Sequence, residues 1–212
     1  MASTSAAVVR AWQVRPKHVL FGVLGALFLF VLWHDERFIF DHSDPSWAYY
    51  LEVRWSILPH GLAGLTALLL GPFQLSTRFR ERHRRAHRIM GRVYLAAVLA
   101  GGCLGMYLAY IHQELHDRIW VFALALSWLL TGSMAFAAAL NRNFDTHRQW
   151  MIRNYALTTA FVTTRIAIAI PFVERGGDAM ARSSNWVVLV GTLLFAEVFL
   201  SWREVFVNRR EK

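Results

Sequence analysis

The sequence has little cysteine and few acidic residues. Cys103 is the single cysteine among 212 residues, and one thiol can form neither an intrachain disulfide nor a zinc site built from thiolates. The chain has 14 acidic residues against 23 lysines and arginines, which gives a net charge of +9. A basic balance of this kind raises nucleic acid as a partner until the positions of the charges are examined.

The sequence also lacks the short motifs of common soluble enzymes. It has no P-loop, no G-x-S-x-G elbow, no H-E-x-x-H and no dinucleotide fingerprint. The chemistries that depend on those motifs therefore find no support in this chain.

Long apolar segments dominate what is present, since 56% of the residues are hydrophobic. A helix needs about 20 apolar residues to cross a bilayer. We find six candidate runs, and the first ends in Phe-Val-Leu-Trp-His without a small-residue cleavage site, so we interpret it as a retained anchor. The pattern predicts one all-α domain over 1–212, an integral membrane bundle of six transmembrane helices with a four-helix core made of helices two to five. The runs are 18–33, 55–75, 93–111, 119–140, 154–173 and 186–202.

The arginines and lysines then predict the orientation. Most lie in the two tails and in the loops after even-numbered helices, above all in the basic loop 76–92, whereas a longer loop, 34–54, lies on the opposite side with few of them. The positive-inside rule places both termini and loop 76–92 in the cytoplasm. The charge is thus a topology signal; it predicts anionic lipid headgroups at the basic loop and no nucleic acid.

Two segments sixty residues apart repeat one pattern. HRIMGRVY covers 87–94 and HRQWMIRNY covers 147–155, and each lies where a basic stretch meets an apolar one. They open predicted helices three and five at the same membrane face. Because helices separated by one hairpin are parallel, we expect these polar groups to lie at similar depth and to converge on one site.

These repeats, with His60-Gly61 and Gly71-Pro72-Phe73-Gln74, carry a family resemblance. From about Leu58 to Glu197 the chain resembles a bacterial family of predicted multi-pass membrane proteins, domain of unknown function 2306. The resemblance implies a helical protein of the bacterial cytoplasmic membrane and implies no activity.

The histidine layout also predicts a cofactor site. His87 and His147 could ligate one haem iron from helices three and five, and His60 with His116 (or His112) could form an outer pair. This layout is similar to that of cytochrome b561 bundles, and it suggests electron transfer through haem b with a quinone or a respiratory complex. The residues proposed to pair with haem propionates are Arg88, Arg92, Arg148 and Arg153.

Other interpretations of these residues stay open. Small residues allow close helix packing without a cofactor, and interfacial histidines and arginines extend toward water. A non-haem metal could instead bind His87, His147 and Asp145. A non-catalytic accessory or assembly subunit fits the same features.

Charges inside predicted helices five and six suggest a carrier. Arg165 and Glu197 each fall near the midplane, where an isolated charge costs about 2.5 kcal/mol or more, so we expect them to pair. Asn154 and Thr158 share a stripe with Arg165 that could line a polar cavity. The structural alternative is an ion pair that sets helix register, with threonines bonded to their own backbone.

Overall fold

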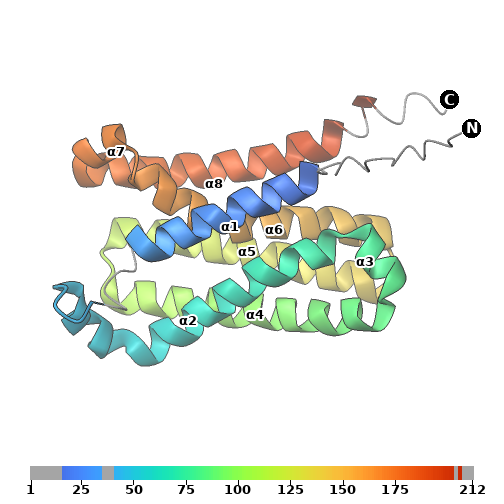
Figure 1. Cartoon of the computed structure of the whole chain (residues 1–212), viewed down its shortest axis with the longest axis horizontal. Coiled ribbons are helices and arrows are strands. Elements are labelled where there is room, and N and C mark those ends of the chain that lie inside the picture. Colours follow the sequence, from blue (N-terminus) through green and yellow to red (C-terminus); the bar gives the residue numbers. More distant parts are fainter. Residues whose placement is uncertain (1–15, 35–40, 203–204, 207–212) are drawn as a thin grey trace, which may run out of the picture.

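A computed structural model of the chain describes residues 16–34, 41–202 and 205–206, and its regular structure there is helical, as predicted (Figure 1). Eight helices follow one another along the described chain. They are α1 (Pro16–His34), α2 (Ser46–Leu75), α3 (Thr77–Arg82), α4 (Arg84–His112), α5 (Leu115–Leu140), α6 (Phe144–Ile168), α7 (Pro171–Arg175) and α8 (Gly177–Trp202).

Four long helices form the core of the bundle. Helix α2 packs on α4, α4 on α5, α5 on α6 and α6 on α2, so the ring closes and α4 faces α6 across its centre. Buried side chains from all four helices meet in the interior, among them Ala67, Tyr94, Ala135 and Tyr155.

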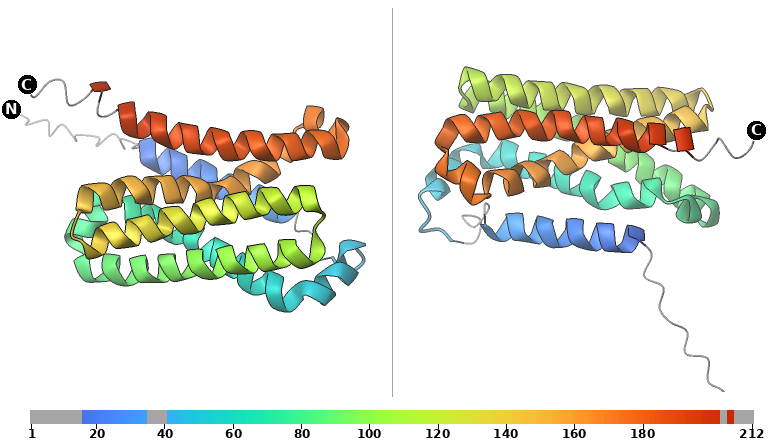
Figure 2. Two further views of the ribbon diagram at one scale, coloured as in Figure 1. Left: turned by 180° about the vertical axis from the view of Figure 1, so that it is seen from behind. Right: turned by 90° about the horizontal axis from the view of Figure 1, so that it is seen from above.

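Helix α6 is the most enclosed of the long helices. Besides α2 and α5, it contacts α1 and α8, which cover its outer side (Figure 2). Val31 of α1 packs against Leu68 of α2 and Val162 of α6, so α1 lies in the groove between those two helices. A helix with protein on so many sides can carry polar residues that lipid would not tolerate.

Length and composition qualify four helices to cross a membrane: α2, α4, α5 and α8. Most of their surface within these apolar windows lies outside the protein interior, as expected for helices that face lipid. Helix α6 falls below this threshold because its sequence is rich in Thr and Arg and also contains Asp145, His147, Gln149 and Asn154.

The helices extend further than the apolar runs that predicted them. The run 55–75 belongs to a helix that begins at Ser46, the run 93–111 to one that begins at Arg84, and the run 154–173 to one that begins at Phe144. Hydropathy detects only the part of a helix suited to lipid, whereas backbone hydrogen bonding continues into polar flanks. Loop 34–54 is consequently shorter than expected, because 46–54 is helical; residues 35–40 of that loop lie outside the described residues.

The basic loop 76–92 is also helical over most of its length. It contains α3 and the first turns of α4. The Ser76 hydroxyl caps α3 by accepting a hydrogen bond from the Phe79 amide at 3.3 Å. The last predicted boundary differs as well: α6 ends at Ile168, and Pro171 opens the short helix α7, because a proline cannot donate the next helical hydrogen bond.

Candidate functional site

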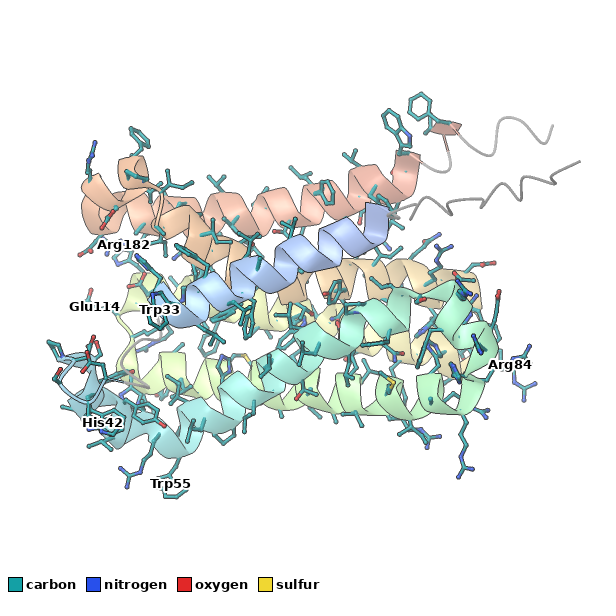
Figure 3. All side chains as sticks on the ribbon, in the orientation of Figure 1. Trp33, His42, Trp55, Arg84, Glu114 and Arg182 are labelled. Carbon is teal, nitrogen blue, oxygen red and sulfur yellow. The ribbon has the colours of Figure 1, made fainter. Side chains whose placement is uncertain are left out.

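The two repeated segments occupy the same position on their helices. The amide of His87 donates to the carbonyl of His83 and that of His147 to the carbonyl of Asn143, both at 2.9 Å, so each histidine closes the first turn of α4 or α6. Both turns lie at the end of the bundle that carries α3, marked by Arg84 in Figure 3. The repeats are therefore matched elements of two parallel helices.

A short turn sets the start of α6. Asn141, Arg142 and Asn143 join α5 to α6, and Arg142 adopts a left-handed conformation with φ 58°. The Asn143 side chain then accepts a hydrogen bond from the amide of Thr146 at 3.2 Å, which is an ordinary helix N-cap. This turn brings His147 back against α5.

The tyrosine that ends the first repeat reaches into the second repeat. Tyr94 is fully buried on α4, and its hydroxyl donates to Asn154 Oδ1 at 2.7 Å. The same oxygen lies 3.0 Å from Thr158 Oγ1. The Thr158 hydroxyl also lies 3.0 Å from the Asn154 backbone carbonyl. Because the Tyr94 proton is used on Asn154, the one Thr158 proton serves either the Tyr94 oxygen or that carbonyl.

Asn154 extends this contact to the third helix. Its amide nitrogen donates to the Trp128 carbonyl at 2.7 Å and to Thr131 Oγ1 at 2.8 Å. The Trp128 indole in turn donates to Thr158 Oγ1 at 2.9 Å. We call Tyr94, Trp128, Thr131, Asn154 and Thr158 the polar core. Its hydrogen bonds join α4, α5 and α6 across the ring.

The stripe predicted to line a cavity is thus used for helix packing. Asn154 and Thr158 are buried in the polar core, and the Thr159 and Thr163 hydroxyls donate to carbonyls of their own helix. This is the arrangement usual for threonine in an apolar helix.

The tyrosine that ends the second repeat contacts α2. The Tyr155 hydroxyl donates to the Leu68 carbonyl at 3.2 Å. That carbonyl has no helical partner, because residue 72, four positions on, is Pro72 and has no amide hydrogen. Gly71 makes room for the ring: a Cβ there would lie 2.0 Å from Tyr155 Cδ2.

Two histidines hydrogen bond to carbonyls of neighbouring helices. His147 Nδ1 lies 2.8 Å from the Ala135 carbonyl of α5, and His60 Nδ1 lies 2.9 Å from the Gly101 carbonyl of α4. A carbonyl oxygen only accepts, so each Nδ1 carries the proton and Nε2 is the remaining ring position.

His87 differs from these two, because its Nδ1 atom is buried without a hydrogen-bond partner among the described residues. Its backbone carbonyl accepts a bond from Gln74 Nε2 at 3.4 Å, and its ring lies within electrostatic reach of Arg80 and His147. His87 therefore supplies a polar atom without a hydrogen-bond partner to the inner cluster, which we define as Gln74, Arg80, His87, Arg88 and His147.

The structure does not support a haem held between His87 and His147. A porphyrin ligated from α4 and α6 would need flat space between these helices. About two turns deeper than the histidines, Tyr94, Asn154 and Thr158 occupy the interior with hydrogen-bonded, buried side chains. His147 is also held against α5. Within the described ranges, no group of three or more His, Cys, Asp or Glu side chains is placed to hold a metal ion, so His87, His147 and Asp145 do not form such a group.

The outer histidines lie at different depths. The predicted run 55–75 puts His60 near the start of its helix, but α2 begins at Ser46, which puts His60 about 21 Å along the helix at about 1.5 Å per residue. His116 is exposed at the start of α5, and His112 packs edge-on against Tyr49 at the end of α4. The structure does not bring His60 to either residue.

The predicted ion pair between Arg165 and Glu197 is wrong. Both Glu197 carboxylate oxygens accept hydrogen bonds from Arg153. Oε1 accepts from Nε, and Oε2 accepts from Nη2 at 3.0 Å. Helix α6 begins at Phe144, so Arg165 lies near its far end. Helix α8 ends at Trp202, so Glu197 lies about 8 Å from the α3 end of the bundle, at about 1.5 Å per residue. The Arg165 guanidinium lies 5.7 Å from the Phe161 ring centre.

The other predicted arginines point outward. Arg88, Arg92 and Arg148 are exposed around the α3 end of the bundle. Arg153 is half-buried and lies over the Trp150 ring at 4.8 Å. The sequence interpretation missed the roles of Gln74, Trp128 and Thr131; only Gln74 had a signal, its place in Gly-Pro-Phe-Gln.

Comparison with known proteins identifies a family for most of the chain. The family model described as "Predicted membrane protein (DUF2306)" matches residues 57–200, a range that contains both repeats, the polar core and Glu197. No curated protein and no solved structure matches the chain.

Proposed function

The chain belongs to the DUF2306 family of predicted membrane proteins, and we propose that it crosses a bacterial cytoplasmic membrane six times and binds anionic phospholipid headgroups at its cytoplasmic end. The proposal takes the α3 end as cytoplasmic and the residues of the inner cluster as part of the headgroup site.

Six spans require α1 and α6 in addition to the four apolar helices. Helix α6 has 25 residues and α1 has 19, or about 37 Å and 28 Å at about 1.5 Å per residue, against a hydrocarbon core of about 30 Å. The polar residues of α6 support a buried span, because Asn154 and Thr158 hydrogen bond within the polar core and Arg153 pairs with Glu197. The first turn of α1 and the last turn of α8 both lie at the α3 end in Figure 1. This supports the placement of both chain termini on the same side of the membrane.

The observation that carries the proposal is the unequal distribution of charge between the two ends. At the α3 end, exposed arginines surround α3 and the first turns of α4 and α6: Arg78, Arg80, Arg82, Arg84, Arg85, Arg88, Arg92, Arg142 and Arg148. At the opposite end, acidic residues outnumber the arginines Arg54, Arg118, Arg175 and Arg182: Asp41, Asp44, Glu52, Glu114, Asp117, Glu174 and Asp178. An excess of arginine marks the cytoplasmic side.

The chemistry of the inner cluster favours a phosphate oxygen as its ligand. Arginine presents a planar set of donors that matches phosphate, and Arg80 and Arg88 are exposed beside His87. The unpartnered His87 Nδ1 adds a donor when the ring is protonated at that atom. Anionic headgroups of the cytoplasmic leaflet lie at this depth.

Cysteine labelling tests the orientation. In a Cys103→Ser background, single cysteines replace Arg85 at the α3 end and Arg175 at the other end, both of which are exposed. We expect a membrane-impermeant maleimide to label the cysteine at 175 in intact cells and the cysteine at 85 only after the membrane is opened. Labelling in the reverse order would overturn the proposed topology.

Lipid retention tests the binding. Native mass spectrometry of the purified full chain should show tighter binding of phosphatidylglycerol than of phosphatidylcholine. Each arginine near an anionic surface is worth about 1 kcal/mol, so Arg85→Gln with Arg88→Gln should weaken retention about tenfold or more. The control, Arg54→Gln with Arg175→Gln, removes the same charge from the other end. Equal losses in both double variants would contradict a site at the α3 end.

A further inference from the structure

A cavity lies at the end of the bundle remote from the inner cluster. It has a volume of about 310 Å³ and opens between the first turns of α5 and α8. Figure 3 labels Arg182, one of its lining residues, at the end that also carries Glu114 and opposite Arg84. Helix α8 packs mainly on α6 and touches α5 only lightly, which leaves this space between their ends.

The walls carry both a cation and an anion. Asp117 comes from α5 and Arg182 from α8, and both line the cavity. No hydrogen bond or ion pair joins them to each other or to another described residue, so two half-buried opposite charges face one space without neutralising each other. Asp117 also lies in the first turn of α5, where a helix favours a negative charge; Arg182 has no such compensation.

The walls also carry an unsatisfied donor and an unsatisfied acceptor. Trp120 Nε1 and Asn185 Oδ1 are both buried, and neither has a hydrogen-bond partner in the part of the chain that the structure describes. An indole nitrogen only donates and an amide oxygen only accepts. Buried polar atoms of this kind are normally paired. A molecule in the cavity that offers one acceptor and one donor would satisfy both once the Trp120 and Asn185 side chains turn toward it.

Aromatic rings and small residues complete the cavity. The Trp120 and Trp186 side chains line it, and indole rings attract ammonium groups. Ala179 and Ser183, one turn apart on α8, also line it and leave the space open because their side chains are small.

We propose that this cavity binds a zwitterion that carries a primary ammonium and a phosphate, the chemistry of a phosphoethanolamine group. Arg182 and Trp120 Nε1 hold the phosphate oxygens. Asp117 and Asn185 Oδ1 accept from the ammonium, which lies beside the two indole rings. At this end of a membrane-spanning bundle, the ligand is either the headgroup of phosphatidylethanolamine or a free solute of the same chemistry.

Lipid binding to the purified, delipidated full chain tests the assignment. We expect native mass spectrometry to show tighter binding of phosphatidylethanolamine than of phosphatidylglycerol, which lacks the ammonium. Phosphatidylethanolamine should also bind about fivefold or more tightly than phosphatidylcholine, because the methyl groups of choline remove the N–H donors that Asn185 Oδ1 needs. Arg182→Gln and Asp117→Asn should each weaken binding about tenfold, the effect of losing a charge-assisted hydrogen bond.

Matched controls come from α7. Arg175→Gln and Glu174→Gln remove the same charges from exposed residues outside the cavity and should leave the affinity unchanged. Ser183→Leu should exclude the ligand by filling the cavity while it retains every charge, so the test does not depend on the charge variants folding.

A competition experiment between the lipid and a soluble analogue identifies the source of the ligand. Displacement of the lipid by soluble glycerophosphoethanolamine would assign the site to a free zwitterion, and its failure to compete would assign the site to the lipid. Equal affinity for the three lipids would overturn the proposal. So would phosphatidylethanolamine binding that survives Arg182→Gln, Asp117→Asn and Ser183→Leu, because the cavity would then hold only water.

Discussion

Tyr155 on α6 donates a hydrogen bond to the Leu68 carbonyl of α2, across 3.2 Å. The bond compensates for a proline, since Pro72 withholds the amide that would otherwise bond Leu68 within the helix. It also connects two motifs of the family-matched region, the Gly71-Pro72 pair and the tyrosine that ends the second repeat. In a bilayer, where water cannot satisfy a freed carbonyl, a partner of this kind is expected.

This relationship predicts a coupled effect of two substitutions. Tyr155→Phe should destabilise the fold by about 1 kcal/mol, because it leaves the Leu68 carbonyl unpaired. In a Pro72→Ala background the restored amide at position 72 bonds Leu68, and the same Tyr155→Phe change should cost little. Unfolding by denaturing detergent, followed by circular dichroism, measures the double-mutant cycle.

Tyr107→Phe is the control for this cycle, because Tyr107 is half-exposed on α4 and its hydroxyl makes no hydrogen bond with another residue that the structure describes. If Tyr155→Phe cost the same in both backgrounds, the hydroxyl would not be compensating for Pro72.

Two glycines on α2 should respond oppositely to alanine. A Cβ at Gly71 would lie 2.0 Å from the Tyr155 ring, whereas one at Gly64 would meet nothing within 4 Å. Gly71→Ala should therefore destabilise the protein by about 2 kcal/mol through overpacking. Gly64→Ala should be neutral or stabilising by up to about 1 kcal/mol, since alanine favours a helix. The same detergent titration compares the two variants, and equal effects would contradict close packing of Tyr155 on Gly71.

The general architecture could be predicted from the sequence because it depends on composition and on local pattern. The apolar runs predict an all-helical membrane protein, and the repeats at His87 and His147 predict matched helix starts. The ends of the helices could not be predicted in this way, because hydropathy changes at the edge of the lipid and the backbone does not. The wrong prediction of an Arg165–Glu197 pair follows directly, because the apolar run begins at position 154 whereas the helix begins at Phe144.

The partners in the polar core were beyond prediction for a different reason. Asn154 and Thr158 are visible as polar residues in an apolar helix, which suggests either a cavity or a buried network. Trp128, which supplies both a carbonyl and an indole donor to them, lies on another helix within an ordinary apolar run. Only the packing of α5 against α6 decides between the two interpretations.

The polar core predicts a ranking of variants. Tyr94→Phe removes one donor from Asn154, and should cost about 1 kcal/mol. Asn154→Ala should cost more, about 3 kcal/mol, because it removes the acceptor of the Tyr94 hydroxyl and the amide donor to Thr131, and also creates a cavity. Thermal unfolding in one detergent ranks them, with Asn141→Ala as the control at an exposed position in the α5–α6 turn. A smaller loss for Asn154→Ala than for Tyr94→Phe would show that Asn154 does not hold the three helices together.

The ion pair between Arg153 and Glu197 predicts which arginine is coupled to α8. The Arg153 side chain is 19% exposed and that of Glu197 is 50% exposed, so solvent screens the pair and its coupling energy should stay at or below about 1 kcal/mol. Arg153→Gln and Glu197→Gln should each lower stability slightly, and the double variant should lose less than their sum. The same cycle between Arg165→Gln and Glu197→Gln should be additive, because these residues lie toward opposite ends of the bundle. A coupling found with Arg165 and absent with Arg153 would place Glu197 at a different depth and would require α8 to shift along α6.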